Sequence, residues 1–190
     1  MNGSSGNLEV WVDREIACVK ITGRAGCACS PPFRSVMLGL RAKGWRRFVL
    51  DLTACQLMDS TFLGVLAGLG LRFSEEPDAQ PAAPAITLLN PSERISGLIE
   101  NLGVAGYFQS VSGASVATGS LQALPQEPAT ADREEIQRTS LEAHQLLIKL
   151  NPANAPKFKD VCQFLEEDMK QLQGRNEPPT HATPLVSKPT

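Results

Sequence analysis

The most distinctive chemical grouping in this sequence is a pair of hydroxyl side chains behind an acidic one. Ser60 and Thr61 follow Asp59 directly, and residues 61–73 carry apolar side chains at helical spacing, which predicts a helix starting at this run. A side chain here can cap the helix. A phosphate on Ser60 would add about -1.5 to -2 charges where free amides and the helix dipole stabilise an anion. Capping and phosphate acceptance are the two chemistries that this run allows.

Cysteine and histidine are the other reactive side chains. The five cysteines include one close pair, Cys27-x-Cys29, and an odd number without a visible export signal favours reduced thiols. His144 and His181 lie far away in the sequence, so neither a metal site nor a Ser–His or Cys–His pair is predicted. We expect no metal, no cofactor and no enzymatic activity.

The overall composition favours a soluble protein of modest charge. Lys and Arg number 18 and Asp and Glu 20, for a net charge of -2, which excludes a broad cationic surface that binds nucleic acid. An apolar fraction of 42% excludes a wholly disordered chain. Residues 1–6 show no signal peptide, and the longest apolar stretch (residues 60–71) is too short to span a bilayer. We expect a cytoplasmic protein that neither binds nucleic acid nor inserts into a membrane.

Composition divides the chain into four parts. Residues 7–111 alternate strand-like and helix-like segments, and residues 112–131 are small, polar and Pro-containing. Residues 132–173 return to helical periodicity, and residues 174–190 are rich in proline. We interpret the parts as an α/β domain, a flexible linker, a helical hairpin and a disordered tail.

The first part predicts strands and helices in the order ββαβαβα, with a short strand at its end (residues 107–111). Residues 8–12 and 17–21 predict a hairpin. Residues 48–52 form a nearly continuous apolar run typical of a strand covered on both faces, on which Val49, Leu50 and Leu52 should be largely buried. This order favours an α/β fold, a mixed β-sheet with helices packed on it.

Two amphipathic helices are predicted in residues 132–173. Their apolar stripes are Ile136, Ala143, Leu147 and Leu150 on the first, and Phe158, Val161, Leu165, Met169 and Leu172 on the second. Because short helices depend on packed apolar faces, we expect a semi-independent hairpin that supplies a second surface for protein binding or self-association. Two solvated helices on a tether, and a lid over the sheet domain, are the alternatives.

One segment resembles a known family. The apolar run of residues 48–52 is followed by DSTFLG (residues 59–64), similar to the Asp-Ser-Ser/Thr-x-Leu-Gly helix start of the STAS domain in anti-sigma factor antagonists. Residues 19–23 and 90–104 resemble the family's second strand and last helix, so the resemblance covers about residues 7–111. It implies a STAS-like mixed sheet, here with a C-terminal helical hairpin as an extension.

The resemblance also implies a function. In that family the serine after the aspartate is phosphorylated by a partner that is both a serine kinase and an anti-sigma factor, and the unphosphorylated form binds this partner. Ser60 holds that position and is expected to be exposed, and Thr61 ranks behind it as an acceptor. The partner-binding surface would comprise Asp59, Ser60, Thr61, Phe62, Gly64 and Arg24. The chain would then act in a bacterial partner-switching pathway that regulates transcription.

Two features depart from the family pattern. The loop from Arg24 to Cys29 lacks the acidic residue that usually faces the nucleotide-bearing partner. Phe62 stands where the family usually has glycine, so we expect its ring to change the surface near Ser60. The missing acid favours an alternative function, a binding or scaffold module that docks a partner without phosphorylation, as STAS-type subunits of lipid-transport assemblies do.

Overall fold

The computed structural model describes residues 6–76, 84–114, 121–125 and 131–176, with residues 172–176 described by their backbone alone. The strands are β1 (Asn7–Val12), β2 (Ile16–Ala25), β3 (Arg47–Asp51), β4 (Cys55–Met58), β5 (Ile86–Leu89), β6 (Gln109–Val111) and β7 (Gln122–Leu124). The α-helices are α1 (Ser30–Ala42), α2 (Ser60–Ser74), α3 (Glu93–Asn101), α4 (Arg133–Leu150) and α5 (Ala155–Asn176).

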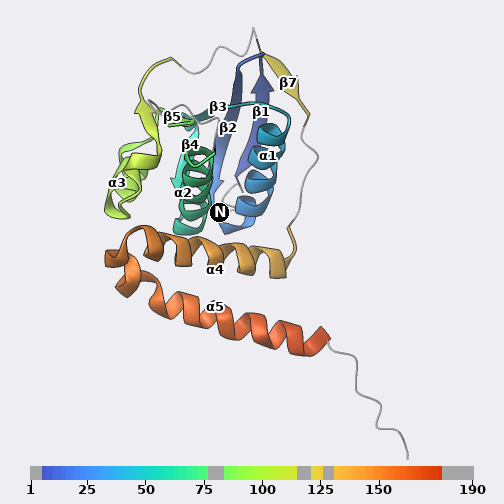
Figure 1. Cartoon of the computed structure of the whole chain (residues 1–190), viewed down its shortest axis with the longest axis vertical. Helices are drawn as coiled ribbons and strands as arrows, with labels where there is room; N and C mark the ends of the chain where they lie inside the picture. The colour runs from blue at the N-terminus through green and yellow to red at the C-terminus, as the bar shows by residue number, and fades with distance from the viewer. Residues whose placement is uncertain (1–5, 77–83, 115–120, 126–130, 177–190) are drawn as a thin grey trace, which may run out of the picture.

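The strands form a seven-stranded mixed sheet in the order β6-β5-β3-β2-β1-β7, with β4 also paired to β2. β1 runs antiparallel to β2 and β7, while β2, β3, β5 and β6 run parallel to one another. The helices pack on this sheet, with α1 and α2 side by side (Figure 1). The predicted α/β fold with a mixed sheet and helices packed on it is confirmed.

The long strand β2 sets the position of the start of α2. It pairs with β3 through Lys20 and then with β4, and the register shifts between Gly23 and Arg24. Gly23 has φ 72°, in the left-handed region that favours glycine. Ala25 pairs with Met58, two residues before α2 begins. The loop after β2 therefore lies beside the N-terminus of α2.

The central strand β3 is less symmetrically buried than the sequence predicts. Phe48 and Leu50 are 1% and 0% exposed, in the main core, but Val49 is only half-buried. Successive side chains of a strand point to opposite faces, so Val49 lies on the face opposite Phe48 and Leu50. Val49 is therefore less completely buried than Phe48 and Leu50, because the two faces of β3 are covered to different extents.

In two places the structure differs from the division into parts that the sequence predicted. Residues 122–124, inside the predicted linker, form β7 and pair with β1 around Trp11. Helix α5 continues to Asn176, past the predicted end of the hairpin at residue 173. The remainder of the predicted tail, residues 177–190, lies outside the described residues.

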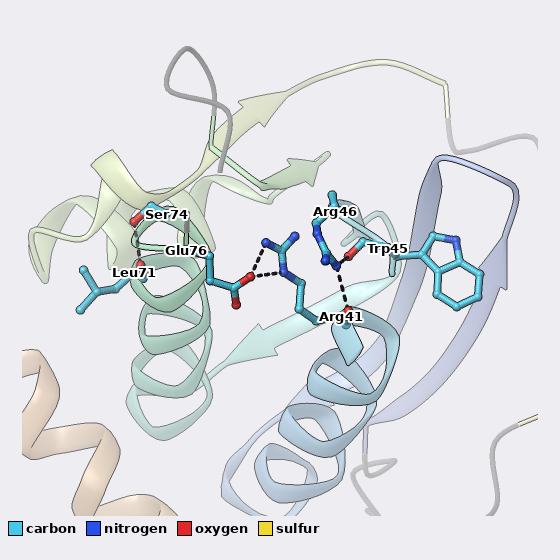
Figure 2. Close-up of polar contacts among 6 residues, drawn as sticks. All are labelled: Arg41, Trp45, Arg46, Leu71, Ser74 and Glu76. Atoms are coloured by element: carbon cyan, nitrogen blue, oxygen red, sulfur yellow. Dashed lines mark hydrogen bonds and ion pairs between the residues drawn. The ribbon is translucent and has the colours of Figure 1, made fainter. Parts of the chain in front are cut away.

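A partly buried ion pair joins the C-terminal ends of α1 and α2. Arg41 of α1 is 7% exposed, and its Nε donates to a carboxylate oxygen of Glu76, just beyond α2, at 2.7 Å (Figure 2). The Arg41 guanidinium also lies 5.3 Å from the centroid of the Phe73 ring. Arg46 donates to the carbonyl oxygens of Arg41 and Trp45. These contacts fix the two helices relative to each other at the end remote from Ser60.

The two C-terminal helices lie against the sheet domain. α4 crosses the N-terminal ends of α1 and α2, and α5 lies on the far side of α4 (Figure 1). Ala143 and Leu147 of α4, with Phe158 and Cys162 of α5, belong to the same buried cluster as the sheet core. The sequence alone did not require the hairpin to dock on the sheet domain. In the structure, α4 lies against that domain, as in the alternative in which the hairpin forms a lid. None of the helices in the described part of the chain is long and apolar enough to cross a membrane.

Candidate functional site

Asp59 is the residue that organises the predicted site. It is the N-cap of α2, in an extended conformation, and its Oδ1 accepts a hydrogen bond from the backbone N–H of Phe62 at 2.8 Å. Its other oxygen, Oδ2, accepts from the backbone N–H of Cys27 at 2.8 Å. One carboxylate therefore ties the start of α2 to the loop after β2. A Cβ at Gly26 would lie 3.0 Å from Oδ2, so glycine permits this close approach.

Ser60 is the first residue of α2 and is half-buried, although the sequence suggested an exposed hydroxyl. Its Oγ shares a hydrogen bond of 2.9 Å with Nε2 of His144 on α4. The neighbouring Thr61 is 5% exposed, and its hydroxyl donates to Oγ of Ser140, also on α4, at 3.3 Å. Both predicted acceptor hydroxyls are thus engaged by the same helix.

The backbones of α2 and α4 approach closely one turn further along. An added Cβ at Gly64 would lie 2.7 Å from both Cβ and the carbonyl oxygen of Ala143, closer than real contacts allow. An added Cβ at Gly68 would lie 2.9 Å from Cδ2 of Leu146. Glycine at position 64 is therefore required for α4 to dock as it does, whereas the contact at Gly68, four residues further along, is with the movable end of the Leu146 side chain.

An ion pair fixes the same helix to α1. Nη1 of Arg34 lies 2.6 Å from a carboxylate oxygen of Glu142, and Nη2 donates to the hydroxyl of Thr139 at 3.4 Å. The side chains of Arg34 and Glu142 are 32% and 51% exposed, so solvent screens the pair and its contribution to stability is small. This contact therefore helps to orient α4 but contributes little to the free energy with which α4 is held.

His144 is the residue of this site that sequence reasoning missed. It is 6% exposed, and its ring centroid lies 4.7 Å from that of Phe158 on α5. Burial lowers its pKa from the usual 6.5, while the charge of Asp59 and the backbone of Ser140 act in the opposite direction. The net lowering keeps the imidazole neutral at pH 7. The sequence contains no local signal for this contact, because Ser60 and His144 are 84 residues apart.

Nothing in the sequence predicted a Ser–His contact, and the one that forms lacks the features of a catalytic pair. In a nucleophilic pair, a third group orients the histidine. Here Nδ1 of His144 is buried without a hydrogen-bond partner among the described residues. The carboxylate of Asp59 is already engaged by two backbone amides. We interpret the Ser60–His144 bond as a docking contact between helices.

The remaining predicted partner-binding residues differ in exposure. Phe62 is 0% exposed, and its ring centroid lies 4.5 Å from that of Phe33 on α1. The expectation that this ring reshapes the surface near Ser60 was therefore wrong, because at this position of α2 the side chain points into the core. Gly64 is buried under α4, whereas Arg24 at the end of β2 is exposed.

The paired cysteines of the neighbouring loop have local structural roles. Sγ of Cys29 donates to the carbonyl oxygen of Gly26 at 3.1 Å, and burial raises its pKa to about 11. Cys27 is exposed, and its backbone N–H is bound by Asp59. Within the described ranges, no three His, Cys, Asp or Glu side chains come together in a way that could hold a metal ion.

Comparison with known proteins gave matches to solved structures alone; no family model and no curated protein matches this chain. The matched structures include those of anti-sigma factor antagonists. The phosphorylated form of the Bacillus cell fate determinant SpoIIAA is 19% identical, with 56% of this chain and 91% of that chain covered and a TM-score of 0.43. Its unphosphorylated form is 18% identical over 58% and 90% of the two chains, at a TM-score of 0.44. An anti-sigma factor antagonist from Mycobacterium paratuberculosis is 16% identical over 56% and 85%, at a TM-score of 0.47.

Proposed function

We propose that this chain is a regulatory binding protein of the anti-sigma factor antagonist type, switched by phosphorylation of Ser60. The observation that supports this best is that Asp59, and not Ser60, caps the start of α2. Asp59 takes the capping role by accepting from the Phe62 amide, so the hydroxyl of Ser60 is not needed as a cap. That hydroxyl is directed toward α4, where it bonds to His144.

Electrostatics explains how a phosphate on Ser60 would act as a switch. The N-terminus of α2 favours an anion through its dipole, so the sheet domain tolerates the added charge. A phosphoserine brings about -1.5 to -2 charges next to the carboxylate of Asp59. A partner surface complementary to a neutral hydroxyl would be repelled by this charge. The partner that fits the proposal is an anti-sigma factor that is also a serine kinase.

The test uses purified full-length chain, Mg-ATP and the serine kinases encoded in the same genome, with phosphate incorporation measured by intact mass. We expect one phosphate on the wild type and on Ser96→Ala, a matched change of a half-buried serine on α3, and none on Ser60→Ala. Ser60→Asp should weaken binding of the partner at least about tenfold through charge repulsion. A phosphate mapped to another residue, or equal partner affinity for Ser60→Asp and the wild type, contradicts the switch.

A second candidate function is a scaffold that docks a partner without phosphorylation. It is favoured by the engagement of the Ser60 hydroxyl with His144 and by the loop from Arg24 to Cys29, which carries no acidic residue. On this alternative, Ser60→Ala and Ser60→Asp bind the partner equally well. The affinity comparison of these two variants therefore decides between the two functions.

The C-terminal helices offer a separate surface for self-association. Phe164 on α5 is a large apolar side chain that is 64% exposed, and exposed aromatic residues are enriched in protein interfaces. We propose that any self-association of the chain uses this side of α5. Analytical sedimentation of the wild type and of Phe164→Ser tests this proposal. An oligomer formed by the wild type should dissociate in the variant. If the variant remains oligomeric, the interface lies elsewhere.

A further inference from the structure

Helix α4 occupies the surface on which the proposed function depends. It bonds to the hydroxyls of Ser60 and Thr61 through His144 and Ser140, and it contacts α2 at van der Waals range over Gly64. We propose that α4 is an intramolecular cover of the Ser60 surface, and that a kinase or protein partner reaches Ser60 only after α4 has moved away. The inference rests on the proposed function and deepens it by naming the regulation of the same site.

The distances leave no room for a phosphate between Ser60 and His144. Oγ of Ser60 and Nε2 of His144 are 2.9 Å apart, the length of a direct hydrogen bond. A phosphoryl group that points from Oγ toward His144 would place phosphorus and oxygen atoms in the volume that the imidazole occupies. The ring of Phe158 on α5 also packs against His144, with the two ring centroids 4.7 Å apart. A phosphate directed toward His144 therefore requires this side chain, and α4 with it, to move.

The two ends of α4 are held differently. At its C-terminal end, the amide of Asn154 in the turn to α5 donates to the carbonyl oxygen of Leu102 at 2.9 Å. The side-chain amine of Lys157 donates to the carbonyl oxygen of Asn101, also at 2.9 Å. Near its middle, α4 contacts α1 through the partly exposed ion pair of Arg34 and Glu142. This distribution favours a swing of α4 about the anchored turn.

The hairpin keeps internal contacts that do not depend on α2. Nε2 of Gln145 on α4 donates to a carboxylate oxygen of Glu166 on α5 at 3.0 Å, and Arg133 pairs with Asp168 at the same distance. These contacts join α4 to α5 along most of their length. α4 can therefore leave α2 together with α5, without separating from it.

Accessibility of position 60 tests the cover without any kinase. A Ser60→Cys chain is treated with a maleimide, modification at this position is followed by peptide mass spectrometry, and the rate is divided by that of the same thiol in the urea-unfolded chain. Ser96→Cys, at a half-buried position on α3, is the matched control. We expect the Cys at position 60 to be protected at least about tenfold more than that at position 96, because it reacts only when α4 opens.

Two changes on α4 should release the cover. Ala143→Leu adds volume where Gly64 leaves none, so it should raise labelling at position 60 by about tenfold, in line with the usual cost of overpacking. Glu142→Ala eliminates the ion pair with Arg34. Because this pair is partly exposed and contributes little, the change should raise labelling at position 60 by only about twofold. Neither change should alter labelling at position 96, and thermal melting verifies that each variant is folded.

The outcomes separate the cover from the proposed function. Equal protection of positions 60 and 96 in the otherwise unaltered chain overturns the cover, as does an unchanged rate at position 60 in both folded release variants. Neither result bears on phosphorylation, since no kinase is present. A release variant that labels rapidly at position 60 and yet is not phosphorylated by any of the kinases supports the cover and contradicts the proposed switch.

Discussion

Helices α2 and α3 begin in the same way and end up in different surroundings. Each starts after a capping side chain that accepts the amide three residues further on. Oδ1 of Asp59 accepts from the N–H of Phe62 at 2.8 Å, and Oγ of Ser92 accepts from the N–H of Ile95 at 3.4 Å. Side-chain caps of this kind satisfy amides that the helix itself leaves unpaired. At the level of local structure, the two helix starts are equivalent.

The difference between them is tertiary. The buried residues of α2 are Thr61, Phe62, Leu63, Gly64, Val65, Leu66, Ala67, Leu69, Gly70 and Phe73, whereas those of α3 are Ile95 and Ile99. The start of α2 is bound to the loop after β2 and covered by α4, while Ser92 is exposed. A capping residue therefore indicates where a helix begins, but it does not indicate whether that end of the helix is accessible to a protein partner.

The largest contrast is expected when a methyl group is added to a glycine of each helix. Gly64→Ala should lower the free energy of unfolding by up to about 3 kcal/mol, because the new Cβ meets Ala143 at 2.7 Å and α4 must shift. Gly97→Ala should raise it by about 0.5–1 kcal/mol, because nothing lies within 4 Å and alanine is the better helix former. Urea unfolding of the two variants measures both; changes of the same sign would show that α4 is not packed on α2 in solution.

Removal of the two caps should produce a smaller contrast. Asp59→Ala should cost about 2 kcal/mol, because two backbone amides, those of Phe62 and Cys27, lose one acceptor. Ser92→Ala should cost about 0.5–1 kcal/mol, since a single, longer bond is lost at an exposed helix start. Thermal unfolding of both variants is the measurement, and equal losses would mean that the bond to Cys27 contributes nothing.

The buried imidazole should make the covered region sensitive to acid. Because burial lowers the pKa of His144 from 6.5, the unfolded chain binds a proton at a higher pH than the folded one does. Stability is therefore unaffected by this group above pH 6.5, falls as the pH drops below it, and levels off below the folded-state pKa. Each unit of lowering corresponds to about 1.4 kcal/mol.

Denaturant unfolding above and below pH 6.5 checks this prediction. His144→Gln, which keeps a polar side chain near Ser60, should show a weaker loss of stability over the same pH range. α3 supplies the internal comparison, because Ser92 at its exposed start binds the backbone N–H of Ile95 rather than a titratable side chain. The same pH profile for His144→Gln and the wild type would assign the acid sensitivity to other groups.

The smallest effect is expected at the pair of Arg34 and Glu142. Both side chains are partly exposed, so Glu142→Ala should lower the free energy of unfolding by less than about 1 kcal/mol. Added salt should reduce even this difference, since exposed pairs are screened. A double-mutant cycle with Arg34→Ala measures the coupling, and a value well above this range would mean that the pair anchors α4.

Sequence patterns predicted secondary structure best where the pattern lies within a single helix or strand. The apolar run of residues 48–52, the helical spacing after Asp59 and the two helices after residue 132 all correspond to elements of the structure. Each of these patterns repeats within a single segment, with period two or with helical spacing. The short strands β4 and β7 were not predicted; they are strands because β2 and β1 pair with them.

The candidate site shows the same division. The sequence by itself determined that a capped helix starts at Asp59 and that Ser60 follows the cap, because capping depends on neighbours within three residues. Only the tertiary structure decided that Phe62 points into the core against Phe33 and that the Ser60 hydroxyl is bound by His144. Those contacts join segments separated by tens of residues, and they depend on backbone approach and burial that no local pattern encodes.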